Sequence, residues 1–479
     1  MTDLGLIIPE ITLLILASGV LMVDVFRKQS SNAVTFWAAV VTLLVVLSQL
    51  ALYFPDGSTV AFFGTTKIDP MGSVLKAFAV VLVLLSFFYA RDYFDKKGIQ
   101  VSEFYILSLF ATIGMLVLIS ANSLLTVYLG LELLSLSLYS MVAMNRDSQE
   151  SAESAMKYFI LGALASGMLL YGISMLYGVS GTLQLDELVA RTDVMGQERV
   201  LLVFGVVFVI VGIAFKLGVV PFHMWLPDVY QGASTPVTLF IGTAPKIAAF
   251  AMAIRLLADG LQGLAHEWAG MLVILAVLSM SIGNIVAIAQ TNMKRMLAYS
   301  TIAHMGFLLL GILAARNSGY AASMFYVIVY TLMSMGAFGT IILLSKSNHE
   351  ADRIVDFSGL AKRSPWFGFI MLVIMFSMAG VPPFAGFWAK WYVLKEVIAA
   401  GYVWLAGVAV FFSIIGAYYY LRIVKLMYFD DAIDTNGLDA SEDMKLVLSV
   451  NGLTIFALGI LPGALMSICV IVTIPYAAG

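Results

Sequence analysis

The chain has 479 residues, of which 61% are hydrophobic and only 11% charged, and its mean hydropathy is +0.98. A soluble domain carries about 25% charged residues, so this composition excludes one and indicates a protein that crosses the membrane many times. The net charge of -3 without a basic block excludes a nucleic-acid interface, and the single Cys469 excludes Cys-ligated iron–sulfur clusters, Cys-type zinc sites and an intrachain disulfide.

The hydropathy pattern predicts fourteen transmembrane helices in an all-α polytopic fold, because each crossing needs about 20 apolar residues. The spans are expected near residues 5–26, 33–54, 70–90, 103–120, 122–144, 152–177, 199–217, 235–258, 268–289, 293–314, 320–345, 364–381, 402–428 and 444–471. No basic segment precedes the first run, so it is expected to be a helix and not a cleavable signal. Two shorter apolar pieces, 222–231 and 385–399, are expected to be the second halves of broken helices seven and twelve.

The distribution of basic residues predicts the orientation in the membrane. Most Lys and Arg residues, including Lys28 and Lys294, fall in the loops reached after odd-numbered spans. The opposite loops are assigned only Lys67, Arg191, Arg199, Arg255, Arg316 and Lys395. Since basic loops face the cytoplasm, both termini are predicted on the opposite, periplasmic side.

Two similar phrases predict an internal repeat. Residues 218–225 read GVVPFHMW and residues 380–388 read GVPPFAGFW, and the two lie five crossings apart. The odd offset makes the repeats inverted, and interrupted helices at matching positions of inverted repeats are a pointer to a transport site. The alternative is that the prolines only kink packing helices.

Glu132 and Lys216 are the first two candidate site residues. Helical spacing places Tyr128, Glu132, Ser135 and Tyr139 on one face, with the carboxylate close to mid-membrane. Lys216 ends an apolar run immediately before the first break, and a lysine there that moves relative to a carboxylate can load and release a proton. The alternatives are a protonated glutamate bonded to a neighbouring helix and a static Lys–Glu pair that locks two helices.

Lys246 and His304 are predicted at similar depth in spans eight and ten. A buried lysine, a histidine and interleaved hydroxyl groups such as Ser300 are the parts of a water-supported proton path. A neutral, hydrogen-bonded core histidine is an equally good interpretation of His304 alone. The line of Tyr326, Tyr330 and Ser334 is more typical of packing than of a pathway.

Lys390 follows the second break, where a functional role competes with snorkelling toward the membrane surface. Lys157 and Lys76 lie only five or six residues into their spans, which also allows snorkelling. Asp228, beyond the first break, fits a surface acid on the cytoplasmic side. No phosphate-binding loop, dinucleotide fingerprint or hydrolytic triad is present in the sequence.

The chain resembles the antiporter-like proton-pumping subunits of respiratory complex I (NADH-quinone oxidoreductase), and within them the subunit N family. The resemblance covers nearly the whole chain, and its most specific segments are 157–163 (KYFILGA), 221–232 (PFHMWLPDVYQG), 291–304 (TNMKRMLAYSTIAH) and 382–390 (PPFAGFWAK). It implies fourteen helices with two inverted five-helix repeats. The chain is then one membrane domain, 1–479, divided into 1–100 (three N-terminal helices), 101–260 (first repeat), 261–430 (second repeat) and 431–479 (C-terminal loop and helix).

The resemblance also implies a role for each candidate residue. Glu132 matches the fifth-helix glutamate and Lys216 the seventh-helix lysine paired with it. Lys246 matches the connecting lysine of helix eight, His304 the central polar position of helix ten, and Lys390 the twelfth-helix residue near the exit to the positive side. Lys157 falls at the sixth-helix lysine of the family.

The implied function is proton translocation in the bacterial inner membrane, coupled to NADH-to-quinone electron transfer in other subunits. This chain is expected to bind no cofactor, with NADH, FMN, iron–sulfur clusters and quinone held by partner subunits. Expected partners are M-type and small K, J and A-type membrane subunits, the lateral helix of the L-type subunit, the redox arm indirectly, and lipid. Two alternatives are a subunit of a multisubunit Na⁺/H⁺ antiporter and a purely structural subunit whose lysines lock helices.

Overall fold

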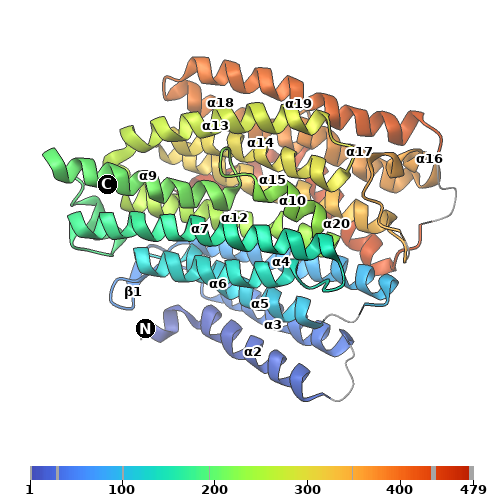
Figure 1. The fold of residues 1–479 in the computed structure, drawn as a ribbon, viewed down its shortest axis with the longest axis horizontal. Helices are drawn as coiled ribbons and strands as arrows, with labels where there is room; N and C mark the ends of the chain where they lie inside the picture. The colour runs from blue at the N-terminus through green and yellow to red at the C-terminus, as the bar shows by residue number, and fades with distance from the viewer. Residues whose placement is uncertain are drawn as a thin grey trace.

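The computed structural model describes residues 3–27, 32–99, 102–193, 195–347, 349–432 and 438–473. Its long helices lie side by side with their axes in nearly one direction (Figure 1), as expected of a chain that crosses a membrane repeatedly. Lys28, one of the residues used to predict the orientation, and the terminal residues 1–2 and 474–479 lie outside the described residues.

The helices and strands have the following bounds. The N-terminal part contains α1 (Asp3–Leu6), α2 (Ile8–Phe26), α3 (Asn32–Leu52), β1 (Thr59–Ala61), β2 (Thr66–Ile68) and α4 (Pro70–Lys97). The middle part contains α5 (Ser102–Ile119), α6 (Leu124–Val142), α7 (Gln149–Ser180), α8 (Leu185–Val189), α9 (Gly196–Leu217), α10 (Trp225–Gly232), α11 (Thr235–Ile241), α12 (Ala244–Ile254) and the short helices η1 (Arg255–Gly260) and η2 (Gln262–Leu264). The C-terminal part contains α13 (Ala265–Ile288), α14 (Met293–Leu313), α15 (Asn317–Leu344), η3 (Ile354–Phe357), α16 (Leu360–Arg363), α17 (Pro365–Ala379), α18 (Ala385–Ala399), α19 (Val403–Phe429), α20 (Glu442–Ile460) and α21 (Pro462–Thr473).

The all-α polytopic prediction is confirmed. Thirteen of the described helical segments are long and apolar enough to cross a membrane, and each falls on a predicted span. The remaining prediction, 364–381, corresponds to α17, which has 15 residues and is continued by α18 after the second break. The predicted span 444–471 is divided into α20 and α21, because Pro462 has no N–H to continue the helical ladder.

Both predicted breaks lie where the sequence places them. Helix α9 ends at Gly218 and α17 ends at Gly380, and both glycines adopt the left-handed conformation, with φ of 80° and 85°. A residue with a Cβ atom rarely adopts this φ, so glycine is the usual residue at such a helix end. A third interruption was not predicted: span 235–258 is divided between α11 and α12 at Gly242 and Thr243.

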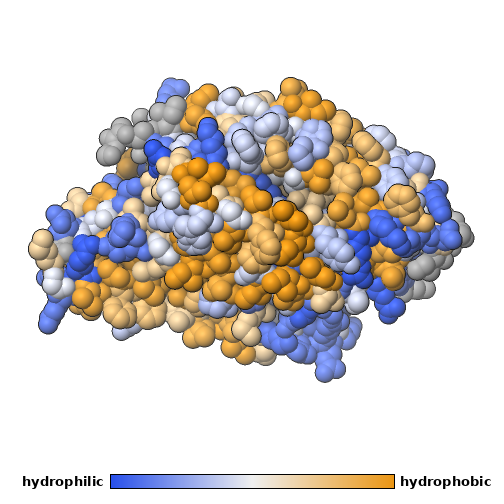
Figure 2. Space-filling view, turned by 90° about the horizontal axis from the view of Figure 1, so that it is seen from above, coloured by the Kyte–Doolittle hydropathy of each residue, from blue (hydrophilic) through white to orange (hydrophobic). Residues whose placement is uncertain are grey.

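The helices are buried to very different extents. Helices α11, α12 and α15 are buried along their whole hydrophobic length and α14 almost completely, whereas α2, α7 and α19 keep a largely exposed apolar side. The space-filling view shows a hydrophobic middle with hydrophilic side chains toward both ends of the long axis (Figure 2). An apolar belt with polar ends is typical of a helix bundle surrounded by lipid. The interior helices α12, α14 and α15 therefore provide the water-excluding part of the protein in which polar side chains need partners.

Candidate functional site

Lys216 lies at the end of α9 and faces α6. Its Nζ donates to the hydroxyl of Ser135 at 3.0 Å, and the lysine is only 6% exposed. Glu132 lies one helical turn before Ser135, and its Oε1 is buried with no hydrogen-bond partner among the described residues. The predicted polar face of α6 is therefore present, but Lys216 contacts the hydroxyl and not the carboxylate.

A small cavity of about 10 Å³ lies between α6, α7 and α9 beside this lysine. Ser135, Tyr139, Ser166 and Lys216 are among its lining residues. A cavity of this size is close to the minimum that holds one water molecule. Lys216 thus has the Ser135 hydroxyl and room for one water beside it, whereas Glu132 is not among the residues that line the cavity.

Lys246 lies in α12 and reaches the C-terminal end of α9. Its Nζ donates to the carbonyl oxygen of Leu217 at 2.8 Å and lies 3.4 Å from that of Lys216. The same nitrogen lies 5.4 Å from the centre of the Trp225 ring. The last carbonyls of a helix have no intrahelical donor and carry partial negative charge, so an ammonium group is stabilised there.

Lys390 repeats this arrangement at the second break. Its Nζ donates to the carbonyl oxygen of Ala379 at 2.9 Å, lies 3.4 Å from that of Met378, and donates to the Ser413 hydroxyl at 2.8 Å. The ring of Phe307 lies 5.1 Å away. Lys390 is 9% exposed and points back to the break, so the snorkelling alternative is wrong for this residue.

His304 lies deep in α14 between two tyrosine hydroxyls. Its Nδ1 is 2.7 Å from the hydroxyl of Tyr326 and its Nε2 is 3.0 Å from that of Tyr420. Tyr420 also contacts Ser300 through a hydrogen bond. Tyr326, expected to be a packing residue, is therefore part of a polar chain with the histidine. Tyr420 was missed, because it lies in the run AYYYL on α19 and nothing in the sequence points to a contact 116 residues away.

Lys157 and Asp228 lie apart from the buried residues described above. Lys157 is 45% exposed and pairs with Asp228 at 2.9 Å and with Glu153 at 2.9 Å. Asp228 also pairs with Arg295 at 2.8 Å, so it connects α7, α10 and α14 and is not an isolated surface acid. Lys157 therefore forms its ion pairs with Glu153 and Asp228 at the surface, away from the interior lysines.

Two basic residues near the ends of spans are buried, although the sequence allowed snorkelling for one and placed the other in a loop. Lys76 is buried and forms an ion pair with Glu10 on α2, so it does not snorkel. Lys294 was counted as a loop residue, but it lies in the first turn of α14, is 4% exposed, and donates to the carbonyl oxygen of Ala233 at 3.0 Å.

Arg255 was also assigned to a loop, yet it is fully buried in η1 at the other end of the bundle. Its guanidinium holds Asp69 with two hydrogen bonds of 2.6 and 2.8 Å and Asp259 with one of 3.0 Å. Burial by itself raises the pKa of Asp69. The charge and hydrogen bonds of Arg255, assisted by Lys67, outweigh burial and bring this pKa down to about 2. The cluster fixes the hairpin β1–β2 and the start of α4 against the end of α12.

Within the described ranges, no group of three or more His, Cys, Asp and Glu side chains is arranged to hold a metal ion. What these residues do offer is a set of proton donors and acceptors: three buried lysines, one glutamate, one histidine and several hydroxyls. Two of the lysines cap the ends of broken helices, and this combination is typical of transport sites built on interrupted membrane helices. Fold and site thus define an antiporter-like membrane subunit.

Comparison with known proteins identifies the family. The family model described as "NADH:quinone oxidoreductase/Mrp antiporter, TM" matches residues 121–416. The protein named NADH-quinone oxidoreductase subunit N from Thiobacillus denitrificans is 54% identical over 463 residues, which cover 97% of this chain and 96% of that protein. The protein of the same name from Nitrosomonas europaea is 52% identical over 461 residues, covering 96% of each. The chain belongs to the NADH-quinone oxidoreductase subunit N family.

Solved structures agree with this assignment. A chain of respiratory complex I from Thermus thermophilus, solved with bound aureothin, is 31% identical and superposes with a TM-score of 0.83 over 96% of this chain and 99% of that one. A chain of the Mrp complex from Dietzia sp. superposes with a TM-score of 0.85 over 98% of this chain and 96% of that one. Its identity is 20%, so this second likeness shows the fold alone.

Proposed function

We propose that this chain translocates protons across the membrane as the N subunit of an NADH-quinone oxidoreductase, along a path that includes Glu132, Lys216, Lys246, His304 and Lys390. The observation that carries the proposal is the repeated lysine cap. At each of the two breaks, a buried ammonium group is held by the last carbonyls of a half-helix. An ammonium held by neutral carbonyls can lose its proton without leaving an unpaired carboxylate behind, unlike one in a buried ion pair.

The path runs from the side with the basic loops to the opposite side. Protons taken up from the cytoplasm charge the region of Lys216 and Lys246, where Glu132 acts through Ser135. A change in the interaction between Glu132 and Lys216 then moves the proton along the hydroxyls around His304 to Lys390. Lys390 releases the proton on the positive side. Moving one charge against 100 mV requires about 2.3 kcal/mol, which a shift of under two pKa units at one lysine supplies. Lys157 sits at the surface and acts on this path only through Asp228.

Redox chemistry belongs to partner subunits in this proposal. NADH, FMN, the iron–sulfur clusters and quinone are bound there, and quinone reduction drives the changes in this chain. Its neighbours are M-type and small K, J and A-type subunits, with the lateral helix of the L-type subunit along its side. It lies in the bacterial inner membrane with both termini on the periplasmic side, and 101–260 and 261–430 are its inverted repeats. The matching caps at Gly218 and Gly380 support this division.

The test is the Lys216→Ala variant in the assembled complex, reconstituted into vesicles. We expect the ratio of protons moved to electrons transferred to fall, together with the coupled quinone-reductase rate. Lys425→Ala is the matched control, since Lys425 is an exposed lysine that pairs with Asp430 at 2.5 Å. An unchanged ratio and rate in Lys216→Ala, with normal assembly on native gels, would contradict the proposal and favour the purely structural alternative.

A further inference from the structure

A second polar cluster lies at the end of the bundle that carries the basic loops. It does not include the buried residues Glu132, Lys216, Lys246, His304 and Lys390. Glu350, in the loop after α15, accepts a hydrogen bond from the Tyr93 hydroxyl at 2.6 Å and another from the Thr235 hydroxyl. Lys97 lies 3.1 Å and Lys294 4.0 Å from the same carboxylate. The residues come from α4, α11 and α14, so the carboxylate is a meeting point of three spans that are distant in sequence.

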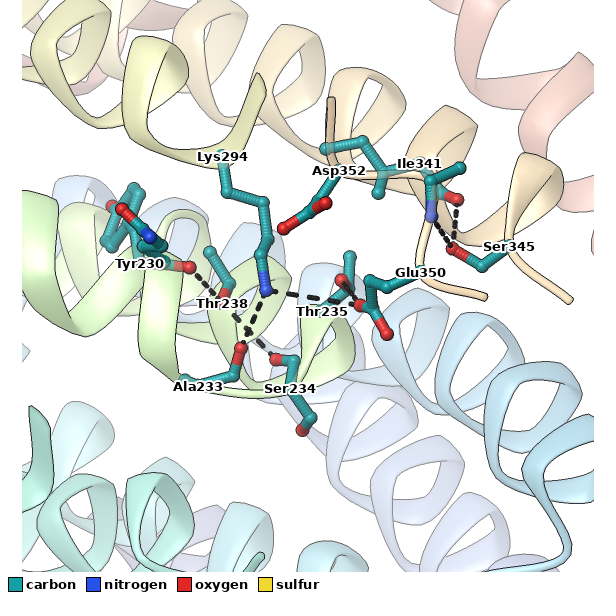
Figure 3. Close-up of polar contacts among 12 residues, drawn as sticks. Tyr230, Ala233, Ser234, Thr235, Thr238, Lys294, Ile341, Ser345, Glu350 and Asp352 are labelled. Atoms are coloured by element: carbon teal, nitrogen blue, oxygen red, sulfur yellow. Dashed lines mark hydrogen bonds and ion pairs between the residues drawn. The ribbon is translucent and has the colours of Figure 1, made fainter. Parts of the chain in front are cut away.

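Lys294 connects this carboxylate to a helix end. Figure 3 shows its side chain extending from α14 toward the carbonyl oxygen of Ala233 and toward Glu350. Ala233 ends α10, the second half of the first broken helix. Lys294 therefore occupies the same kind of position as Lys246 and Lys390, with the difference that it also has a carboxylate within reach.

A cavity of about 650 Å³ adjoins the cluster. Its walls include Tyr93, Phe94, Glu103, Ser140, Arg146 and Ser234. Tyr93 bonds directly to Glu350, and Ser234 immediately precedes Thr235, which also bonds to Glu350. The cavity is large and partly polar, which suits water. Its lining thus brings water within one side chain of this half-buried carboxylate.

Helix α14 leads from the cluster toward the buried candidate residues around His304. Helix α14 carries Lys294 at its start, Thr301 seven residues later and His304 ten residues later, so the histidine lies roughly 15 Å deeper along the same helix. A seven-residue spacing places Lys294 and Thr301 on one face. Thr301 accepts a hydrogen bond from Tyr330 at 2.7 Å, and the Tyr330 ring lies 5.3 Å from the imidazole of His304.

We propose that the cluster of Tyr93, Glu350, Thr235 and Lys294 is the proton inlet of this subunit, filled from the adjoining cavity; this inference rests on the proposed function. A hydronium ion in the cavity gives a proton to the Tyr93 oxygen while Tyr93 passes its own proton to Glu350 Oε2. The hydronium ion becomes water, the Tyr93 hydroxyl is restored, and the carboxyl group of Glu350 holds one proton taken from the cavity.

The electrostatics of Glu350 fit an inlet that attracts protons. Burial alone raises the pKa of Glu350, but the charge of Lys294, the hydrogen bonds from Thr235 and Tyr93 and the charge of Lys97 together hold it below its usual value. The carboxylate is therefore negative when no proton is in transit. Its two lysine neighbours keep it from trapping the proton that arrives.

The cavity can be tested separately from the carboxylate, because the only cysteine of the chain, Cys469, is buried. In Ser140→Cys, a charged methanethiosulfonate reagent that does not cross membranes is added to everted vesicles after the complex has assembled. We expect the proton-to-electron ratio to fall toward that of Lys216→Ala. The same reagent on Asp439→Cys, an exposed position on the same side, and on the unmodified complex are the controls.

Glu350→Gln tests the carboxylate itself, with Glu350→Asp expected to restore part of the transport. Asp431→Asn is the matched control, because Asp431 is a fully exposed acid paired with Lys362. Wild-type ratios in labelled Ser140→Cys and in Glu350→Gln, alongside a lowered ratio in Lys216→Ala, would overturn the inlet and leave the proposed function in place. A wild-type ratio in all of them, including Lys216→Ala, would overturn both.

Discussion

The Nζ of Lys246 lies 2.8 Å from the carbonyl oxygen of Leu217, the last residue of α9. Lys390 Nζ lies 2.9 Å from the carbonyl oxygen of Ala379, the last residue of α17. A helix that stops inside a membrane leaves carbonyls without donors, and lipid cannot provide them. In each case a lysine from another helix or half-helix takes the place of the missing N–H groups. The same Nζ atom therefore satisfies the carbonyls of the helix end and carries the proton to be transported.

Substitution of Lys246 by arginine separates these two roles. Lys246→Arg keeps a cation able to cap the α9 carbonyls, but a guanidinium does not release its proton at any physiological pH. We therefore expect normal assembly and a lowered proton-to-electron ratio, measured with a pH-sensitive dye during NADH oxidation. Lys246→Met removes the cap as well and leaves buried carbonyls unpaired, at a cost of about 1–3 kcal/mol each. Its complex should also unfold at a lower temperature.

The exposed Lys362, paired with Asp431 at 2.8 Å, provides the control substitutions Lys362→Arg and Lys362→Met. Full pumping by Lys246→Arg would show that the lysine only caps the helix end.

Removal of the Ser135 hydroxyl should weaken the link between Glu132 and Lys216. In Ser135→Ala the ammonium of Lys216 loses its 3.0 Å partner, and the route through this hydroxyl is lost. We expect slower proton transport in reconstituted vesicles with the complex still assembled, because an alanine fits the space of a serine. Ser137→Ala is a closely matched control: Ser137 is also buried on α6, but its hydroxyl bonds only to the carbonyl of Leu133. Equal transport by both variants would show that the Ser135 hydroxyl does not link Glu132 to Lys216.

The sequence predicts those site residues that stand out within their own span. A charged residue in an apolar run is visible without any structure, and for this reason Glu132, Lys216, Lys246 and Lys390 were identified. The partners of these residues were not, because each partner is a backbone carbonyl or a hydroxyl on a different helix. Neither Leu217 as an acceptor nor Tyr420 as a neighbour of His304 leaves a signal in local composition.

The basic residues near the ends of spans were harder to interpret. The count of basic residues used for the orientation assigns Arg255 and Lys294 to loops, although both lie near the ends of the predicted spans 235–258 and 293–314. The structure buries both, with Asp69 paired to Arg255 and Glu350 near Lys294. Each acid lies in a different loop more than 50 residues away, so only the folded arrangement reveals the pair. The break at Gly242 is different, because Pro245 follows three residues later in the first turn of α12 and marks it in the sequence.

The Asp69–Arg255 pair gives the protein a defined loss of stability in acid. The pKa of Asp69 is about 2 in the folded chain, compared with about 3.9 in an unfolded one. A carboxyl with a lowered folded-state pKa stabilises the fold above its unfolded pKa, and this stabilisation is lost as pH falls through the folded value. The shift corresponds to roughly 2.5 kcal/mol. Asp69→Asn should therefore lower the unfolding temperature of the complex by a constant amount above about pH 5, with the difference shrinking toward pH 2.

Thermal unfolding of the purified complex across this pH range measures the difference between the two proteins. Asp56→Asn, an exposed acid in the loop before β1, should unfold like the wild type at each pH. A wild-type-to-variant difference that does not change between pH 5 and pH 2 would show that the pair does not titrate as inferred.

Tyr420 is expected to be a working part of the histidine chain. Tyr420→Phe keeps the ring in place but removes the hydroxyl that bonds both His304 Nε2 and Ser300. The imidazole is then left with only Tyr326 as a partner, and a buried polar atom without a partner costs about 1–3 kcal/mol. Proton transport should slow while NADH oxidation in an uncoupled assay stays normal. Tyr89→Phe is the matched control, because Tyr89 is buried on α4 and its hydroxyl has no hydrogen-bond partner among the described residues. If both phenylalanine variants pump at the same rate, His304 is a core histidine and the path to Lys390 bypasses it.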